Sequence, residues 1–386
     1  MLISRRNVLR QIAAGATTAA IPSLTKVSFG AVRGSARPAE TNGNVAAPIR
    51  LSRNENAYGP SVRVTAAMQE AAVHTANRYP DTEAEALRIQ IAVFHRVAPE
   101  QVVLGCGSSE IMRMAADAFA GRGKKLVLAR PTFDLIARFT EKAGAEVIAV
   151  ELSKDYSHDL DQMLARIDAA AGLVYICNPN NPTGTLTRRQ DVEAFVRSLP
   201  PATYILIDEA YHHYVTPSSD YASFIDRPID DDRIIVTRSF SNVYGLAGLR
   251  IGYAVAAPAT ARLLESCRLP DEMNIIAAKA AITALGDTEH VAESVKRNAD
   301  DRQEFFNQAN ARMVRCIDSH ANFVMINTGR PAVEVIEHFT KNNIALGPPI
   351  PSFDDHSRVS LGTPEDMFEF WRVWDLLPGA HNMAHE

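Results

Sequence analysis

The sequence predicts an α/β fold with a large domain, in which a mostly parallel sheet is wrapped by helices, and a smaller α+β domain. Short apolar runs alternate with helical runs over residues 84–290, and this alternation is typical of a parallel sheet with helices on its faces. From about Ala292 the pattern changes to a long charged helix, followed by short strands and helices. We therefore expect a large domain at 84–290, a small domain at 291–386, and an N-terminal segment at 48–83 that joins the small domain.

The individual elements are predicted from local patterns. Leu87, Ile91 and Phe94 recur at helical spacing, and "SEIMRMAADAFAG" is a second helix that Gly121 closes. A further helix is expected at "PAVEVIEHFTKNN". Apolar runs of strand length end in glycine or polar residues, which indicates that parallel strands bring these residues to one edge of the sheet. The expected strands are QVVLGCG, KKLVLARP, AEVIAVEL, AGLVYICNP, TYILIDEAY and RIIVTRSFS in the large domain, and NFVMINTG and SRVSLGT in the small one.

The composition restricts the class of ligand. The 386-residue chain has 46% hydrophobic and 22% charged residues, which is ordinary for a soluble globular protein. Its net charge of −5, without a long run of one sign, argues against nucleic acid as a partner, because phosphate backbones require a basic surface. The four cysteines form no CxxC pair, so no metal site is expected. Small molecules are the expected ligands.

The N-terminus differs from the rest of the chain. Arg5 and Arg6 stand side by side before a mildly apolar run over residues 12–24, which is too short to span a bilayer as a permanent helix. This segment resembles a twin-arginine export signal, and a frayed amphipathic helix is the alternative. We expect a signal at 1–33 and a linker at 34–47. The protein is then periplasmic or otherwise exported, without a stable membrane anchor, or cytoplasmic if the signal does not function.

Three motifs follow expected strands. "GCGSSE" places Ser108 and Ser109 at a helix start, where unpaired N–H groups and the helix dipole favour a phosphate, although a plain strand-to-helix turn has the same pattern. "NPNNPTG" at 178–184 is a dense turn whose amides either bind something or only stiffen the chain. "LIDEAY" places Asp208 at the end of an apolar strand. A buried carboxylate there needs a cationic partner, either a pyridinium nitrogen or an arginine.

Two further motifs carry arginines. "SFSNVYGLAGLRIGY" brings Ser239, Ser241 and Arg250 into one segment, and hydroxyls together with a guanidinium suit a phosphate. A turn with a surface arginine is the alternative. "SRVSLGT" places Arg358 inside a strand, where its guanidinium suits a substrate carboxylate or forms an ordinary ion pair.

Taken together and in this order, the motifs resemble those of the fold-type I pyridoxal-phosphate enzymes, in particular the class I/II aminotransferases similar to histidinol-phosphate aminotransferase. "LSRNENAYGPS" looks like the N-terminal segment of that group, and "NRYPD" like its phosphate-facing turn. The resemblance runs from about Ile49 to the C-terminus. It implies transfer of an amino group between an amino acid and a 2-oxo acid, with pyridoxal 5′-phosphate as the cofactor.

The resemblance also implies a role for each matching residue. Asp208 pairs with the ring nitrogen and keeps it protonated, so that the ring accepts electrons. Asn181 and Tyr211 bind the phenolic oxygen of the ring, and Phe133 stacks on its face. The residues implied to hold the cofactor phosphate are Gly107, Ser108, Ser109, Ser239, Ser241 and Arg250.

Four further positions are implied to meet the substrate or a second subunit. Arg358 binds the α-carboxylate of the amino acid, and Asn54 and Tyr58 line the substrate pocket. Tyr79 reaches the phosphate held by a neighbouring subunit, which implies a homodimer.

The chain departs from the family at two places. Asn242 stands where the family has the lysine that bonds covalently to the cofactor and then carries a proton. An amide is neither nucleophilic nor basic near neutral pH, and neither Lys154 nor Lys279 substitutes for that lysine by its position. In addition, "GPP" at 347–349 replaces an arginine that meets a substrate phosphate in many relatives, which argues against histidinol phosphate as the substrate.

Three interpretations follow from Asn242. The chain is an aminotransferase-family protein that binds the cofactor and turns over slowly or not at all. Alternatively, it is a lysine-less enzyme of another reaction type, in which His212 or His213 acts as the base. The third interpretation is a non-catalytic periplasmic protein that keeps the fold for binding alone.

Overall fold

The computed structural model describes residues 47–216, 218–269 and 273–378. The predicted export signal lies outside these residues, as does nearly all of the linker. Among the described residues, no helix combines the length and the apolar character that a membrane crossing requires.

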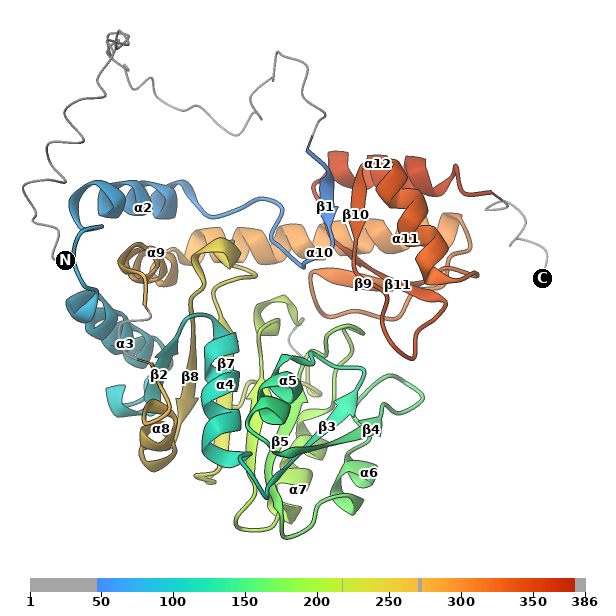
Figure 1. Cartoon of the computed structure of the whole chain (residues 1–386). Helices are drawn as coiled ribbons and strands as arrows, with labels where there is room; N and C mark the ends of the chain where they lie inside the picture. Colours follow the sequence, from blue (N-terminus) through green and yellow to red (C-terminus); the bar gives the residue numbers. More distant parts are fainter. Residues whose placement is uncertain (1–46, 217, 270–272, 379–386) are drawn as a thin grey trace, which may run out of the picture. The chain divides into compact units, whose positions relative to one another are not determined.

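A seven-stranded sheet forms the centre of the larger part of the chain (Figure 1), with strand order β2-β8-β7-β6-β5-β3-β4. Only β8 runs opposite to the other six strands of this sheet, so the prediction of a mostly parallel sheet is confirmed. The sequence analysis assigns no strand to β8, whose pattern is obscured by the glycine-rich segment before it. The strands are β2 (Val102–Gly105), β3 (Lys125–Arg130), β4 (Glu146–Glu151), β5 (Ala171–Cys177), β6 (Tyr204–Asp208), β7 (Ile234–Ser239) and β8 (Gly252–Ala256).

Helices cover both faces of this sheet because its strands are apolar on both sides. In β5, Leu173 and Tyr175 face one core, whereas Val174 and Ile176 face the other, as the two-residue period of a strand requires. The first core is closed by α4 (Ser108–Phe119), α5 (Leu135–Lys142) and α8 (Pro258–Glu265). The second is closed by α2 (Val62–His74), α3 (Asp81–His95), α6 (Leu160–Ala165), α7 (Arg189–Ser198) and α9 (Ile275–Leu285).

The rest of the chain builds two small sheets around a separate aromatic core. The N-terminal strand β1 pairs in parallel with β10, and β9 pairs antiparallel with β11. Phe339 stacks on Phe370 in this core, with ring centroids 4.8 Å apart. The elements are β1 (Ile49–Leu51), α10 (Thr288–Ala311), β9 (Phe323–Asn327), α11 (Ala332–Lys341), β10 (Ile344–Leu346), β11 (His356–Ser360) and α12 (Pro364–Trp374).

Candidate active site

A cavity of about 610 Å³ lies where β5, β6 and β7 end and α4 begins. This is the edge at which open α/β sheets bind ligands. The segment after β1 and the strand β11 complete its wall. The lining residues are Arg53, Asn54, Glu55, Ser108, Ser109, Phe133, Cys177, Asn181, Asp208, Ala210, Tyr211, Ser239, Ser241, Asn242, Ala247, Gly248, Arg250 and Arg358.

One end of the cavity offers donors suited to a phosphate. Ser108 and Ser109 are the first two residues of α4, so their free N–H groups and the positive end of the helix dipole meet there. The guanidinium of Arg250 lies 3.4 Å from the hydroxyl oxygens of Ser109 and Ser241. Gly107 precedes the helix with a φ of 77°, and a Cβ there would collide with the Arg250 guanidinium. The residue therefore has to be glycine for this arginine to lie against the helix start.

The floor of the cavity is formed by Asp208, which is only 3% exposed. The hydroxyls of Tyr175 and Thr237 and the N–H of Ala210 donate to its carboxylate at 3.0, 3.0 and 3.2 Å. Burial raises the pKa of Asp208 to about 6, and the hydrogen bonds from Tyr175 and Thr237 offset part of that effect. Because all three donors are neutral, a cationic group in the cavity would stabilise the ionised carboxylate. A protonated pyridine nitrogen fits this requirement.

A chain of polar contacts crosses the wall from Asn54 to Arg358. The hydroxyl oxygen of Tyr211 accepts hydrogen bonds from Asn54 Nδ2 at 2.9 Å and from Asn181 Nδ2 at 3.2 Å. Its own proton is therefore available to donate, and burial raises the pKa of Tyr211, so the proton stays in place. Asn181 Oδ1 accepts from Arg358 Nη1 at 2.5 Å, and the carbonyl of Ser52 accepts from Arg358 Nη2 at 2.8 Å.

Arg358 nevertheless keeps hydrogen-bonding capacity. Its Nε is buried and makes no hydrogen bond among the described residues. A guanidinium has five N–H donors, and two of them are used by Asn181 and Ser52. An anion placed beside this side chain would therefore find donors that the protein has not used.

Asn242 lines the cavity just beyond the end of β7 and is 7% exposed. Its Nδ2 donates to the carbonyl of Ala210 at 2.9 Å, and the N–H of Ala210 holds Asp208. Among the residues that the structure describes, no lysine belongs to the lining of this cavity. Lys279 lies on α9, where it forms an ion pair with Glu83 on α3 at 3.4 Å.

Some predicted residues lie outside the cavity lining. Tyr58 donates its hydroxyl to Asp301 of α10, and Tyr79 is 74% exposed between α2 and α3. His212 and His213 are packed beside tyrosines, His212 with the Tyr221 hydroxyl at 3.0 Å. Burial, together with the charge of a nearby arginine, lowers the pKa of His213 to about 3.

Sequence reasoning missed the partners of Asp208. Tyr175 comes from β5, and Thr237 lies directly opposite Asp208 in the register of β6 and β7. The signal for Thr237 was a lone hydroxyl in the otherwise apolar start of "IIVTRS", because a buried polar side chain needs a partner. The third partner of Asp208 is the backbone N–H of Ala210, and no side chain in the sequence signals it.

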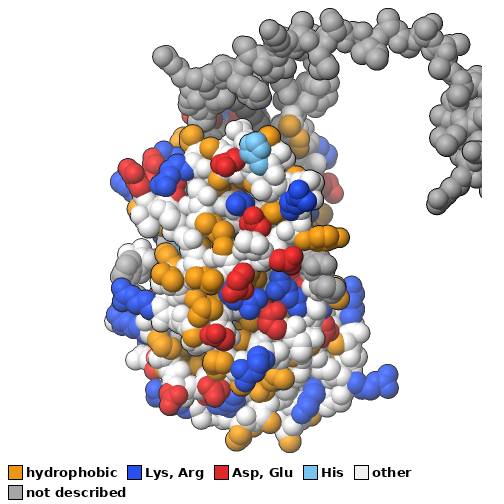
Figure 2. All heavy atoms as spheres, turned by 90° about the vertical axis from the view of Figure 1, so that its left-hand side faces the viewer, with side chains coloured by type: hydrophobic (Ala, Val, Ile, Leu, Met, Phe, Trp, Pro, Cys, Tyr) orange, Lys and Arg blue, Asp and Glu red, His pale blue; other side chains and the backbone are white. Residues whose placement is uncertain are grey.

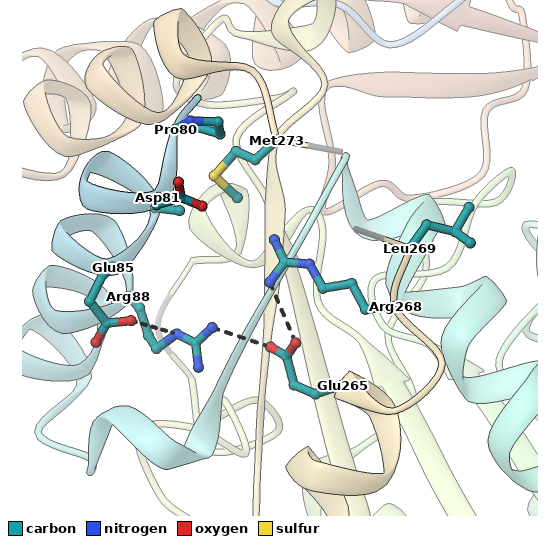
Figure 3. A pocket seen from close by; sticks show the side chains of 9 residues that line it. Pro80, Asp81, Glu85, Arg88, Glu265, Arg268, Leu269 and Met273 are labelled. Carbon is teal, nitrogen blue, oxygen red and sulfur yellow. Dashed lines mark hydrogen bonds and ion pairs between the residues drawn. The ribbon is translucent and has the colours of Figure 1, made fainter. Parts of the chain in front are cut away.

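A second cavity of about 400 Å³ lies between α3 and the end of α8. Figure 3 shows Arg88 lying between Glu85 and Glu265, at 3.5 Å from each, and Arg268 contacting Glu265 at 3.4 Å. No residue of this cavity was predicted as a site residue. Among the described residues, no group of His, Cys, Asp or Glu side chains is arranged to hold a metal ion.

The mostly parallel sheet and the first cavity, with its floor carboxylate and its helix-start serines, agree with the class of α/β protein that the sequence resembles. The family of class I and II aminotransferases matches residues 46–372, and the chain belongs to this family. This confirms the resemblance found in the sequence.

Individual relatives make the comparison more specific. Over 323 residues the chain is 34% identical to the histidinol-phosphate aminotransferase of Caldicellulosiruptor saccharolyticus, with 83% of this chain and 89% of the relative covered. It is 36% identical over 319 residues to histidinol-phosphate aminotransferase 1 of Bacillus anthracis, covering 82% and 85%. The structure of histidinol-phosphate aminotransferase from Sinorhizobium meliloti, in complex with pyridoxal 5′-phosphate, matches with a TM-score of 0.80 and 27% identity, covering 87% and 91%.

Proposed function

We propose that this protein binds pyridoxal 5′-phosphate in the first cavity and acts on an amino acid and a 2-oxo acid, with turnover limited by Asn242. The proposal is supported by three features that meet in one cavity. They are the buried Asp208 carboxylate, Arg250 beside the start of α4, and Arg358, which keeps an N–H donor that no described residue uses. When bound, pyridoxal phosphate supplies an electron-accepting ring and a carbonyl carbon that takes up amines.

The cavity residues have distinct tasks in this proposal. Asp208 holds a proton on the ring nitrogen by ion pairing from the floor. Tyr211, whose hydroxyl proton is free to donate, meets the phenolic oxygen together with Asn181, and Phe133 covers the ring. The phosphate is held by the α4 start, Gly107, Ser108, Ser109, Ser239, Ser241 and Arg250.

Arg358 is the proposed site for the α-carboxylate of the substrate. Asn181 and Ser52 fix the orientation of its guanidinium, and Asn54 lies on the same side of the cavity. The names of the relatives support histidinol phosphate or a similar amine as the amino donor. The segment 347–349, without an arginine, argues for a donor that lacks the phosphate. We therefore propose an amino acid as the donor class and a 2-oxo acid as the acceptor.

Asn242 sets the expected rate. A positioned general base is worth about 10²–10⁴ in rate, and the amide cannot act as one. His212 and His213 are outside the lining, which argues against a different reaction with a histidine base. A binding protein without turnover is the second candidate, because no lysine from the described part of the chain lines the cavity.

We also propose a homodimer in which Tyr79 reaches the neighbouring site. Figure 2 shows apolar side chains exposed among charged ones on one face of the molecule. Val62 on α2 and Val93 on α3 are 87% and 72% exposed. Tyr79 lies on the connection between α2 and α3, at 74% exposure. Sedimentation of the full chain as a monomer would contradict this part of the proposal. Export by the twin-arginine route remains a proposal from the N-terminal sequence.

The decisive experiment is the cofactor content of the purified full chain. Absorption spectroscopy and mass spectrometry of the released small molecule should identify pyridoxal or pyridoxamine phosphate, either as purified or after loading. Asp208→Ala should retain much less. Failure to take up either form, even in large excess, would rule out the proposed function.

A further inference from the structure

The orientation of the Asn242 amide determines what it presents to a ligand. Its Nδ2 points to the Ala210 carbonyl at 2.9 Å, and the reverse orientation would place two oxygens against each other. Oδ1 therefore faces away from Ala210. It accepts no hydrogen bond from the described residues, and it is not among their buried unbonded polar atoms. Because Asn242 is 7% exposed and lines the cavity, that small exposed area is on the cavity side.

The cavity thus has a hydrogen-bond acceptor at the position where the resemblance found in the sequence implies a lysine amine. The aldehyde oxygen of pyridoxal phosphate can only accept hydrogen bonds, so it gains nothing from Oδ1. The aminomethyl group of pyridoxamine phosphate donates, and it carries positive charge when protonated.

We propose that the cavity selects the amine form of the cofactor, pyridoxamine 5′-phosphate, over the aldehyde form and holds it without a covalent bond. The inference rests on the proposed function, because it needs the ring and phosphate to lie in the first cavity. It adds that Asn242 is a specificity-determining residue for the state of the cofactor.

The two forms differ in one substituent, so the phosphate and ring contacts cancel in a comparison of their affinities. The protonated aminomethyl group gains one charge-assisted hydrogen bond to Asn242 Oδ1 that the aldehyde cannot form. The dissociation constant of the amine form should therefore be lower by about tenfold or more. The absence of a lysine among the lining residues removes the covalent bond that would otherwise favour the aldehyde.

The test is a calorimetric titration of cofactor-free full-length protein with each form. A dissociation constant about tenfold lower for pyridoxamine phosphate supports the proposal. Equal affinities, or tighter binding of the aldehyde, overturn it while leaving the proposed function intact. Binding of neither form removes the proposed function itself, so the two failures are distinguishable.

Three variants of Asn242 separate its acceptor from its size. Asn242→Leu keeps the number and branching of the side-chain heavy atoms without an acceptor and should bind both forms equally. Asn242→Asp keeps an acceptor, adds charge, and should increase the preference for the amine. Asn242→Lys should reverse the preference, and borohydride treatment should then attach pyridoxal phosphate to the chain, as seen by intact mass. Retention of the amine preference in a folded Asn242→Leu variant would overturn the proposal, as would a loss of that preference in Asn242→Asp.

Discussion

The two cavities differ in how their charges are balanced. In the second cavity Arg88 lies between Glu85 and Glu265, and Arg268 shares Glu265, so the charges neutralise one another. In the first cavity Asp208 is held by neutral donors, and the hydrogen-bond partners of Arg358 among the described residues are the neutral Asn181 amide and the Ser52 carbonyl. Charged side chains that form ion pairs with other residues of the protein indicate a structural role. Charges held in place without an opposite charge indicate a ligand.

The largest expected effect comes from restoring an amine to the first cavity. Asn242→Lys supplies a nucleophile and a base where the rest of the site is present, so transamination should rise by about 10²–10⁴. The transamination rate is measured with a panel of amino acids, and a coupled assay detects the 2-oxo acid that is released. Asn242→Gln is the matched control, since it lengthens the side chain without adding an amine. A rate unchanged by lysine would mean that other parts of the site are defective.

Removal of the floor charge should weaken cofactor binding. Asp208→Asn keeps the size of the side chain but loses the ion pair with a protonated ring nitrogen, so the dissociation constant should rise by about 10- to 100-fold. Titration followed by absorption spectroscopy measures the change. Glu265→Gln, which removes a carboxylate from the second cavity, is the control and should leave the affinity unchanged.

Asp208→Asn should also stabilise the protein when no cofactor is bound. The pKa of Asp208 is raised by burial from an ordinary 3.8 to about 6, so the folded state binds the proton more tightly than the unfolded chain does. Stability therefore falls as pH rises from about 4 to 6, and the cost remains at neutral pH. Asp208→Asn should increase the free energy of unfolding at pH 7 by about 2–3 kcal/mol, with no gain near pH 4. Denaturant unfolding at the two pH values tests this, and an equal gain at both would contradict it.

The smallest effect is expected in the second cavity. Arg268→Ala removes one partly exposed ion pair with Glu265, whose worth is about 0–1 kcal/mol. Cofactor affinity should not change. A strong loss of binding in this variant would mean that the second cavity also serves a ligand.

The sequence was informative wherever a site residue directly follows a strand. Asp208 ends β6 and Ser239 ends β7, and parallel strands bring such residues together regardless of the rest of the fold. Ser108 was predictable for the same reason, because it begins the helix after β2. The mostly parallel sheet could be predicted because its strands are short apolar runs separated by helices.

Contacts between distant segments could not be predicted. Arg358 is oriented by Asn181 and Ser52, which lie 177 and 306 residues away in the chain. Strand β8 runs antiparallel within a parallel sheet, and the glycine-rich segment before it obscures where the strand begins. These features depend on tertiary packing, which local patterns do not encode.

The backbone at Ala210 has a consequence for engineering. Its N–H contacts the floor carboxylate and its carbonyl contacts the amide of Asn242, so a single residue of main chain sets the spacing between the two functional positions. The methyl side chain of Ala210 takes part in neither of these two main-chain contacts. Attempts to reposition one functional group relative to the other would therefore require inserted or deleted residues, whereas an exchange of chemistry at position 242 needs only one substitution.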